Sequence, residues 1–256
     1  MPTPVHSPTD YMVTLVSCFL AVDPALWSRM AIRLDQIVPW GRSCREYELM
    51  FDLAPEDLSS TILDCGGGPS SFTAEMTARG HRVVSVDPIY SYSGAEIRAR
   101  FDATIDTILA QVRATPDDWV WGCHRNPDDL RANRCVVMEK FLLDYEAGLR
   151  EQRYARGELS VLPFPSNAFG LALCSHLLFL YSELLSAEFH VRSVLELCRV
   201  AREVRLFPLL SHGGELSPHI VPVQTALASA GWHSEIRPVR YEFQRGGNQM
   251  LRVFKP

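Results

Sequence analysis

The sequence lacks the features that mark membrane proteins and nucleic-acid binders. Its longest uncharged apolar run near the start, residues 11–22, is shorter than the roughly 20 residues that cross a bilayer. Asp10 precedes that run, where a secretory signal would carry basic residues. Lysine and arginine form no runs. The chain has 25 of these basic residues and 30 acidic residues, which gives a net charge of −5. We therefore expect no membrane partner and no broad surface for RNA or DNA.

Paired cysteines are also missing. The 7 cysteines are odd in number and contain no CxxC pair, which disfavours a disulfide framework and a zinc finger. No group of His, Cys and Asp residues has the spacing of metal ligands, so we expect no metal. Together with the missing signal sequence, these absences predict a cytoplasmic protein.

The composition itself is that of a folded globular chain. Of the 256 residues, 47% are apolar and 21% are charged, close to the averages for such domains. A chain of this length can bury a full core without disulfides or metals. Apolar residues at helical spacing within residues 11–50 predict a helical N-terminal cap over residues 1–55. One α/β domain is expected to fill residues 56–256.

The clearest pattern begins at residue 61. Residues 61–65 form a short apolar run that is followed by three glycines, which predicts a buried strand and a turn. A helix over residues 70–79 should end at Gly80, and residues 82–87 form a second apolar run that ends in Asp87. Strand, glycine turn, helix and strand make up half of a doubly wound parallel sheet.

Residues 89–156 are too many for a simple crossover between strands. They carry two stretches of helical spacing, and we expect them to form a helical lid inserted into the domain. After this insertion, predicted strands and helices alternate again. Strands are predicted over residues 169–175, 203–210, 232–243 and 249–254, and helices over residues 186–201 and 222–230. The Arg-Gly-Gly-Asn turn at residues 245–248 predicts that the last two strands are antiparallel.

The segment from residue 62 to residue 87 suits a nucleoside. A glycine turn lets a ligand approach the backbone closely, because no Cβ stands in the way. The carboxylate of Asp87 can accept hydrogen bonds from two ribose hydroxyls. A dinucleotide fingerprint would need a third glycine at the position of Ser71, which weakens the case for a nicotinamide cofactor.

These motifs resemble those of the class I S-adenosylmethionine-dependent methyltransferases. Residues 63–68, Leu-Asp-Cys-Gly-Gly-Gly, are similar to the first motif of that family, and Asp87 is similar to its second-strand acidic residue. Residues 157–169, with Gly-Glu, Leu-Pro-Phe-Pro and Asn-Ala-Phe, resemble its third motif. The resemblance covers residues 60–87 and 157–256. It implies a Rossmann-like, seven-stranded, mostly parallel sheet with an antiparallel C-terminal hairpin.

The resemblance also implies which residues bind the cofactor. Gly66 and Gly68, with Gly67 between them, would line its methionine part, and Asp64 would lie beneath the amino group. The other implied contacts are Asp87 with Pro88 at the ribose, Glu158 with Leu159 at the adenine, and Cys174 near the methyl group. Three positions depart from the family pattern: Ser70 stands at the third glycine, Gly170 replaces the usual Asp after Phe169, and Glu158 replaces the more common Asp.

His176 is the candidate catalytic base, because its ordinary pKa lies near neutrality. The alternative is a structural histidine at a strand end. His212 should lie on the same edge of the sheet, either at the substrate or facing solvent. Arg42 and Tyr47 would either close over the carboxylate of the cofactor or form salt bridges at the surface.

The sequence thus predicts a methyltransferase that uses S-adenosylmethionine and encloses a small-molecule acceptor under its lid. A protein that binds the cofactor or its demethylated product without catalysis is an alternative of another class. A nicotinamide-dependent oxidoreductase is the third interpretation. The methyltransferase and the non-catalytic binding protein differ in whether an acceptor can reach the methyl group of the cofactor.

Overall fold

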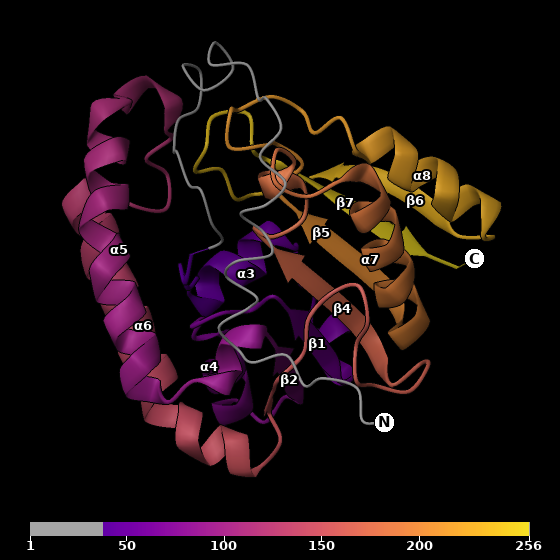
Figure 1. Ribbon diagram of the computed structural model, residues 1–256, viewed down its shortest axis with the longest axis horizontal. Helices are drawn as coiled ribbons and strands as arrows, with labels where there is room; N and C mark the ends of the chain where they lie inside the picture. Colours follow the sequence, from indigo (N-terminus) through magenta and orange to yellow (C-terminus); the bar gives the residue numbers. More distant parts are fainter. Residues whose placement is uncertain (1–37, 256) are drawn as a thin grey trace, which may run out of the picture.

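The computed structural model describes residues 38–255, which form a seven-stranded sheet with helices on both faces (Figure 1). The strand order is β3-β2-β1-β4-β5-β7-β6. Strands β1 to β5 run parallel, and β7 is antiparallel to both β5 and β6. The strands are β1 (Ile62–Cys65), β2 (Val83–Val86), β3 (Tyr154–Ala155), β4 (Phe169–Ser175), β5 (Ala201–Phe207), β6 (His233–Pro238) and β7 (Gln249–Phe254). This is the sheet that the sequence predicted.

The strand order reverses between β1 and β4, and ligands of open parallel sheets bind at such a point, outside the carboxyl ends of the strands. The helices are α3 (Cys44–Met50), α4 (Phe72–Ala78), α5 (Gly94–Ala114), α6 (Pro127–Arg150), α7 (Ala187–Val200) and α8 (Ile220–Ser229). Helices α3 to α6 share one apolar cluster, and α7 and α8 share the other. Within residues 38–255, no helix combines the length and apolarity needed to span a bilayer.

Alternate residues of each central strand enter the two apolar clusters. In β4, Leu171 and Leu173 face the first cluster, whereas Ala172 and Cys174 face the second. The side chains of a strand alternate between its two faces, so a strand with helices on both sides is apolar throughout. This explains why the strands could be found as short continuous apolar runs.

Two predicted strands are shorter in the structure. β5 ends at Phe207 and not at residue 210, because the nitrogen of Pro208 carries no hydrogen for the ladder. β6 ends at Pro238 and not at residue 243. The reason is that the chain then leaves β7: the Val120 N–H donates to the Phe243 carbonyl, with 2.8 Å between nitrogen and oxygen.

The cap and the insertion also differ from their predicted bounds. Residues 1–37 lie outside the described residues, so of the predicted cap the structure describes only α3 and its flanks. The insertion, predicted to span residues 89–156, contributes its last residues to the sheet, where β3 pairs with β2. Phe141 and Tyr145 of α6 pack on Tyr90 and Tyr154. The helices α5 and α6 therefore stand in the crossover from β2 to β3, and their role as a lid stays a prediction.

A buried ion pair joins α3 to α6. Glu46 accepts two hydrogen bonds from Arg134, each with 2.7 Å between nitrogen and oxygen. Tyr241, which follows β6, donates to the same carboxylate at 3.0 Å, and His124 lies 3.4 Å from it. Glu46 also closes the capping box of α3 with Ser43. One carboxylate thus fastens four segments that lie far apart in the sequence.

We expect Arg134→Met to lower the free energy of unfolding by about 3–5 kcal/mol, because it leaves the Glu46 carboxylate buried without its partner charge. Arg131→Met is the matched control. Arg131 lies on the same helix and pairs with Asp106 at the surface, where such a pair contributes about 0–1 kcal/mol. Urea unfolding of both variants measures the difference. Equal losses in the two would show that the Glu46 cluster has no special role.

Candidate functional site

The glycine turn between β1 and α4 has the geometry that the sequence predicted. Gly66 and Gly68 have φ angles of +70° and +52°, in the left-handed region that favours glycine. A Cβ on Gly67 would overlap both the Asp64 carboxylate and the Ser85 hydroxyl. The Gly66 N–H donates to the Val86 carbonyl at 2.8 Å, which ties the turn to the end of β2.

Asp64 lies under the turn with its side chain fully buried, and its place beneath the amino group of the cofactor stays a prediction. Tyr47 donates to Oδ1 at 2.9 Å, and Ser85 and Ser70 donate to Oδ2 at 3.1 and 3.4 Å. Burial raises the pKa of Asp64 to about 7. Protein hydroxyls occupy both of its oxygens, so Asp64 supports the turn from below.

Asp87 stands at the end of β2, beside the turn. Its Oδ2 accepts from the Gly68 N–H at 3.0 Å, and its Oδ1 accepts from the Ile89 N–H at 2.8 Å. Each carboxylate oxygen has a second lone pair, so Asp87 keeps room for two further donors. Burial raises the pKa of this carboxyl to about 6. Pro88, the next residue, is exposed.

The predicted adenine contacts reach the same edge. Gly157 approaches the end of β2 so closely that a Cβ there would lie 2.8 Å from Cγ2 of Val86. Glu158 follows it with an exposed side chain, and Leu159 is buried. The structure thus brings residues 157–159 to the side of Asp87. Their contact with a ligand stays a prediction.

The end of β4 carries the two remaining predicted residues. Cys174 packs in the apolar cluster that β4 shares with α7 and α8, and burial raises the pKa of its thiol to about 12. Its side chain therefore belongs to the core and does not point out of the sheet edge. The place of this residue near the methyl group of the cofactor stays a prediction.

His176 has a φ of +52°, and its N–H donates to the Phe207 carbonyl at 2.7 Å. Its Nδ1 lies 2.8 Å from the Ser175 hydroxyl. Burial, followed by the charge of Arg42, holds the pKa of His176 well below its usual value. The imidazole is therefore neutral at pH 7, and it is a weaker base than its ordinary pKa suggests.

Several residues of this site were missed in the sequence. Tyr90 donates to the Gly68 carbonyl at 2.7 Å and lies 2.7 Å from the Ser85 hydroxyl. Nothing in the local pattern identifies such partners. Tyr47 and Arg42 were noted, but the surface alternative is wrong for both, because Arg42 is 8% exposed and Tyr47 is 1% exposed.

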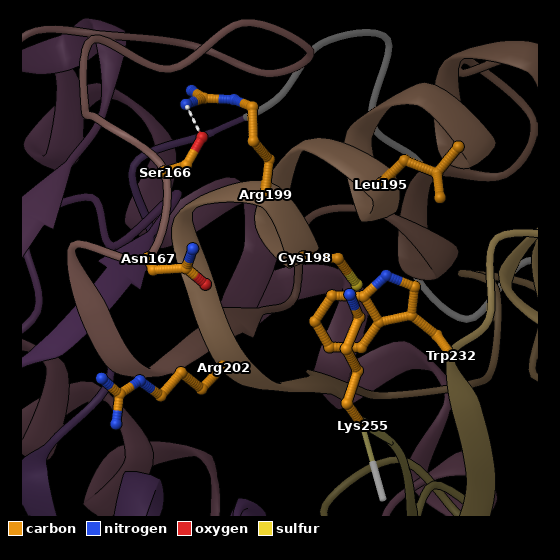
Figure 2. A pocket seen from close by; sticks show the side chains of 8 residues that line it. All are labelled: Ser166, Asn167, Leu195, Cys198, Arg199, Arg202, Trp232 and Lys255. Atoms are coloured by element: carbon orange, nitrogen blue, oxygen red, sulfur yellow. Dashed lines mark hydrogen bonds between the residues drawn. The ribbon is translucent and has the colours of Figure 1, made fainter.

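A pocket of about 570 Å³ lies elsewhere. Figure 2 shows it beside Asn167, Cys198 and Trp232, with Lys255 over the indole ring. Asn167 precedes β4 and Lys255 follows β7, so the pocket lies at the amino ends of the parallel strands. The glycine turn is at the opposite edge. Within residues 38–255, no three His, Cys, Asp or Glu side chains are grouped to hold a metal ion.

The chain is 30% identical over 221 residues to MJ0045, an uncharacterized protein of Methanocaldococcus jannaschii, across 86% of this chain and 97% of that protein. No family model matches the chain.

Solved structures with a similar fold include methyltransferases. A TehB-like S-adenosylmethionine-dependent methyltransferase of Corynebacterium glutamicum matches with a TM-score of 0.43 and 13% identity, over 96% of this chain and 95% of that one. The glycopeptide N-methyltransferase MtfA matches with a TM-score of 0.43 and 12% identity, over 99% and 100%. The magnesium protoporphyrin IX methyltransferase of Synechocystis, solved with bound S-adenosylmethionine, matches with a TM-score of 0.39 and 10% identity, over 77% and 70%. The fold assignment rests on the strand order and not on these scores.

Asp64→Asn should change how stability depends on pH. The folded pKa of about 7 lies above the unfolded value near 3.9. Between these values the folded state binds more protons than the unfolded state, so wild-type stability falls as pH rises from 4 to 7. The neutral amide lacks this dependence. The variant should therefore gain about 2–4 kcal/mol relative to wild type across that window.

Urea unfolding at pH 4.5, 6 and 8 measures the change. Asp102→Asn, on the exposed face of α5, controls for the removal of one negative charge. A difference between Asp64→Asn and wild type that stays the same at all three pH values would contradict the shifted carboxyl.

Proposed function

The chain belongs to the same family as MJ0045 of Methanocaldococcus jannaschii, and on the site described above we propose that it is a methyltransferase that uses S-adenosylmethionine. The observation that carries the proposal is the pairing of Gly68 with Asp87 at the ends of adjacent parallel strands. It sets a carboxylate with free lone pairs beside a backbone that a ligand can approach. A nucleoside with a ribose diol fits that combination.

The glycine turn leaves space for this cofactor at Gly68. A Cβ there would have only Asp87 Oδ2 near it, at 4.0 Å, so the space above the turn is open toward the carboxylate. We assign Gly66 and Gly68 to the methionine part, Asp87 to the ribose, and Glu158 with Leu159 to the adenine. S-adenosylmethionine supplies, when bound, a sulfonium methyl group that leaves readily. The chain has to hold donor and acceptor in line and exclude water.

The start of α4 argues against a dinucleotide. Pyrophosphate groups bind to free N–H groups at a helix N-terminus. Here the Ser71 N–H already donates to the Arg42 carbonyl at 3.1 Å. The Ser71 hydroxyl donates to Glu75 in the first turn at 2.7 Å, which adds a negative charge where phosphates would lie. These contacts favour a cofactor without phosphates.

We place the acceptor over the ends of β4 and β5, next to His176. A neutral imidazole can hydrogen-bond the attacking group and take its proton. Its depressed pKa favours acceptors that need little help from a base. Residues 118–120, which connect α5 to α6, are held in place by the Phe243 carbonyl and the Arg245 N–H. We infer from this that α5 and α6 act as a fixed wall around a small molecule.

We also propose that the protein works in the cytoplasm. Cys65 and Cys174 are register partners on neighbouring strands, and both are free thiols. Neighbouring unpaired cysteines are compatible with a reducing compartment.

Gly68→Ala should weaken the binding of S-adenosylhomocysteine at least tenfold, because the new methyl group fills the space where the cofactor would lie. Gly80→Ala is the matched control. Gly80 also has a positive φ, +85°, with nothing within 4 Å of a Cβ, and it lies away from the turn. Calorimetric titration of both variants separates loss of the site from backbone strain. No binding to the wild type would refute the proposal, and so would equal weakening in both variants.

The affinity for S-adenosylhomocysteine should fall several-fold between pH 7.5 and pH 5. Acidification through pH 6 protonates Asp87, which then accepts weaker hydrogen bonds from the ribose. In Asp87→Asn the affinity should be lower at pH 7.5 and should lose most of this dependence on pH. Titrations of both proteins at four pH values measure the effect. Parallel curves for the two would show that Asp87 does not contact the ligand.

A further inference from the structure

Arg42 carries a buried positive charge. Its side chain is 8% exposed, and among residues 38–255 no carboxylate forms an ion pair with it. Its Nη1 donates to the Trp40 carbonyl at 2.9 Å, but its buried Nε has no hydrogen-bond partner. A guanidinium stays protonated in proteins, and a buried charge is normally paired.

The nearest acidic group on the same segment is already saturated. Arg134 binds both oxygens of Glu46, and Ser43 donates to Oε2 from its N–H and its hydroxyl, each at 2.8 Å. Tyr241 donates to Oε1. Glu46 therefore pairs with Arg134, and among residues 38–255 Arg42 has no carboxylate in direct contact, although the charge of Glu46 acts on it.

His212 is linked to the segment of Arg42 through Tyr181, which packs on the His212 ring and hydrogen-bonds the backbone of Val38, and it also has an open hydrogen-bonding position. It follows β5, it is 8% exposed, and its buried Nε2 has no partner. Its ring packs edge-on against Tyr181 with 4.7 Å between centroids. The backbone N–H of His212 donates to the Leu180 carbonyl at 3.1 Å. Burial and the charge of Arg42 lower the pKa of His212 to about 4. A neutral His212 can donate one hydrogen bond to an anion.

We propose that Arg42 and His212 bind a carboxylate group of the methyl acceptor at the ends of β4 and β5. The inference rests on the proposed methyltransferase function and narrows its substrate class to carboxylic acids. Arg42 offers its Nε–H edge, which matches a carboxylate in plane. His212 offers a second nitrogen, its unpartnered Nε2, from the segment that follows β5.

The position of Arg42 favours the acceptor over the carboxylate of the cofactor. Its main chain packs against the start of α4, where its carbonyl accepts from Ser71. Its charge acts on Tyr47 beside the turn, but also on His176, His212 and Tyr181 at the ends of β4 and β5. Tyr181 hydrogen-bonds the backbone of Val38, four residues before Arg42, which brings this segment to those strand ends. Tyr47, the other residue noted for the cofactor, donates its hydroxyl to Asp64 instead.

The direct test observes the Arg42 Nε–H by nuclear magnetic resonance in protein saturated with S-adenosylhomocysteine. Its signal is assigned by its disappearance in Arg42→Lys. Sodium benzoate should shift this signal saturably, whereas benzamide, its neutral counterpart, should not. A benzoate titration without effect would overturn the proposal, and so would an equal response to benzamide.

Variants give an independent readout. Arg42→Met should weaken benzoate binding at least tenfold and leave the affinity for S-adenosylhomocysteine within twofold of wild type. His212→Phe keeps the ring against Tyr181 and should weaken benzoate binding three- to tenfold. Arg131→Met, at the surface, should change neither affinity. Arg42→Lys keeps the charge, and it should retain part of the benzoate binding if the other variant fails to fold.

Two further outcomes separate this inference from the function on which it rests. If Arg42→Met loses affinity for S-adenosylhomocysteine but not for 5′-methylthioadenosine, which lacks the carboxylate, Arg42 serves the cofactor and the proposal fails. If the wild type does not bind S-adenosylhomocysteine at all, the methyltransferase function fails. The benzoate titration then decides the anion site alone.

Discussion

The bidentate contact between Glu46 and Arg134 is the constraint on which the site depends. Alone, α3 has seven residues, too few to be stable without tertiary contacts. The contact holds α3 against α6, and Tyr241 and His124 bind the same carboxylate from two other segments. A buried charge pair of this kind tolerates few alternative arrangements, because a misplaced partner leaves a charge unsatisfied. The position of α3 on the sheet is thereby set.

Side-chain hydroxyl groups connect α3 to the glycine turn. Tyr47 follows Glu46 directly and donates to Asp64, while its ring stacks on Phe72 of α4 with 4.4 Å between centroids. Asp64 accepts from Ser85, and Ser85 lies next to Tyr90, which donates to the Gly68 carbonyl. The glycine turn is therefore held both by its own φ angles and by a buried network that starts at the ion pair.

The sequence predicted the sheet because its central strands are apolar on both faces and are punctuated by glycine, Asp and Pro. It located Asp64, the glycines and Asp87 for the same reason, since they lie within or just after the last residues of β1 and β2. It could not find Tyr90, Ser85 or the pairing of Glu46 with Arg134, because these contacts join residues up to 88 positions apart and leave no periodic signal. The two residues of β3 are too few to show a period of two, so they were placed in the insertion. Arg42 was noticed, but no local pattern distinguishes a buried arginine from a surface one.

Because the oxygens of Glu46 are already occupied by other donors, Arg42 remains available to bind an anion. Two arginines, Arg42 and Arg134, act on the Glu46 carboxylate, and burial followed by the charge of Arg134 lowers the pKa of Arg42. Arg134 takes the carboxylate because its two Nη atoms meet both oxygens in plane. Arg42 then keeps a full charge beside two neutral histidines, in a region from which water is largely excluded. A charge in such surroundings attracts an anion more strongly than it would at the surface. The ion pair between Glu46 and Arg134 therefore both positions α3 and leaves Arg42 available to bind the negative charge of a ligand.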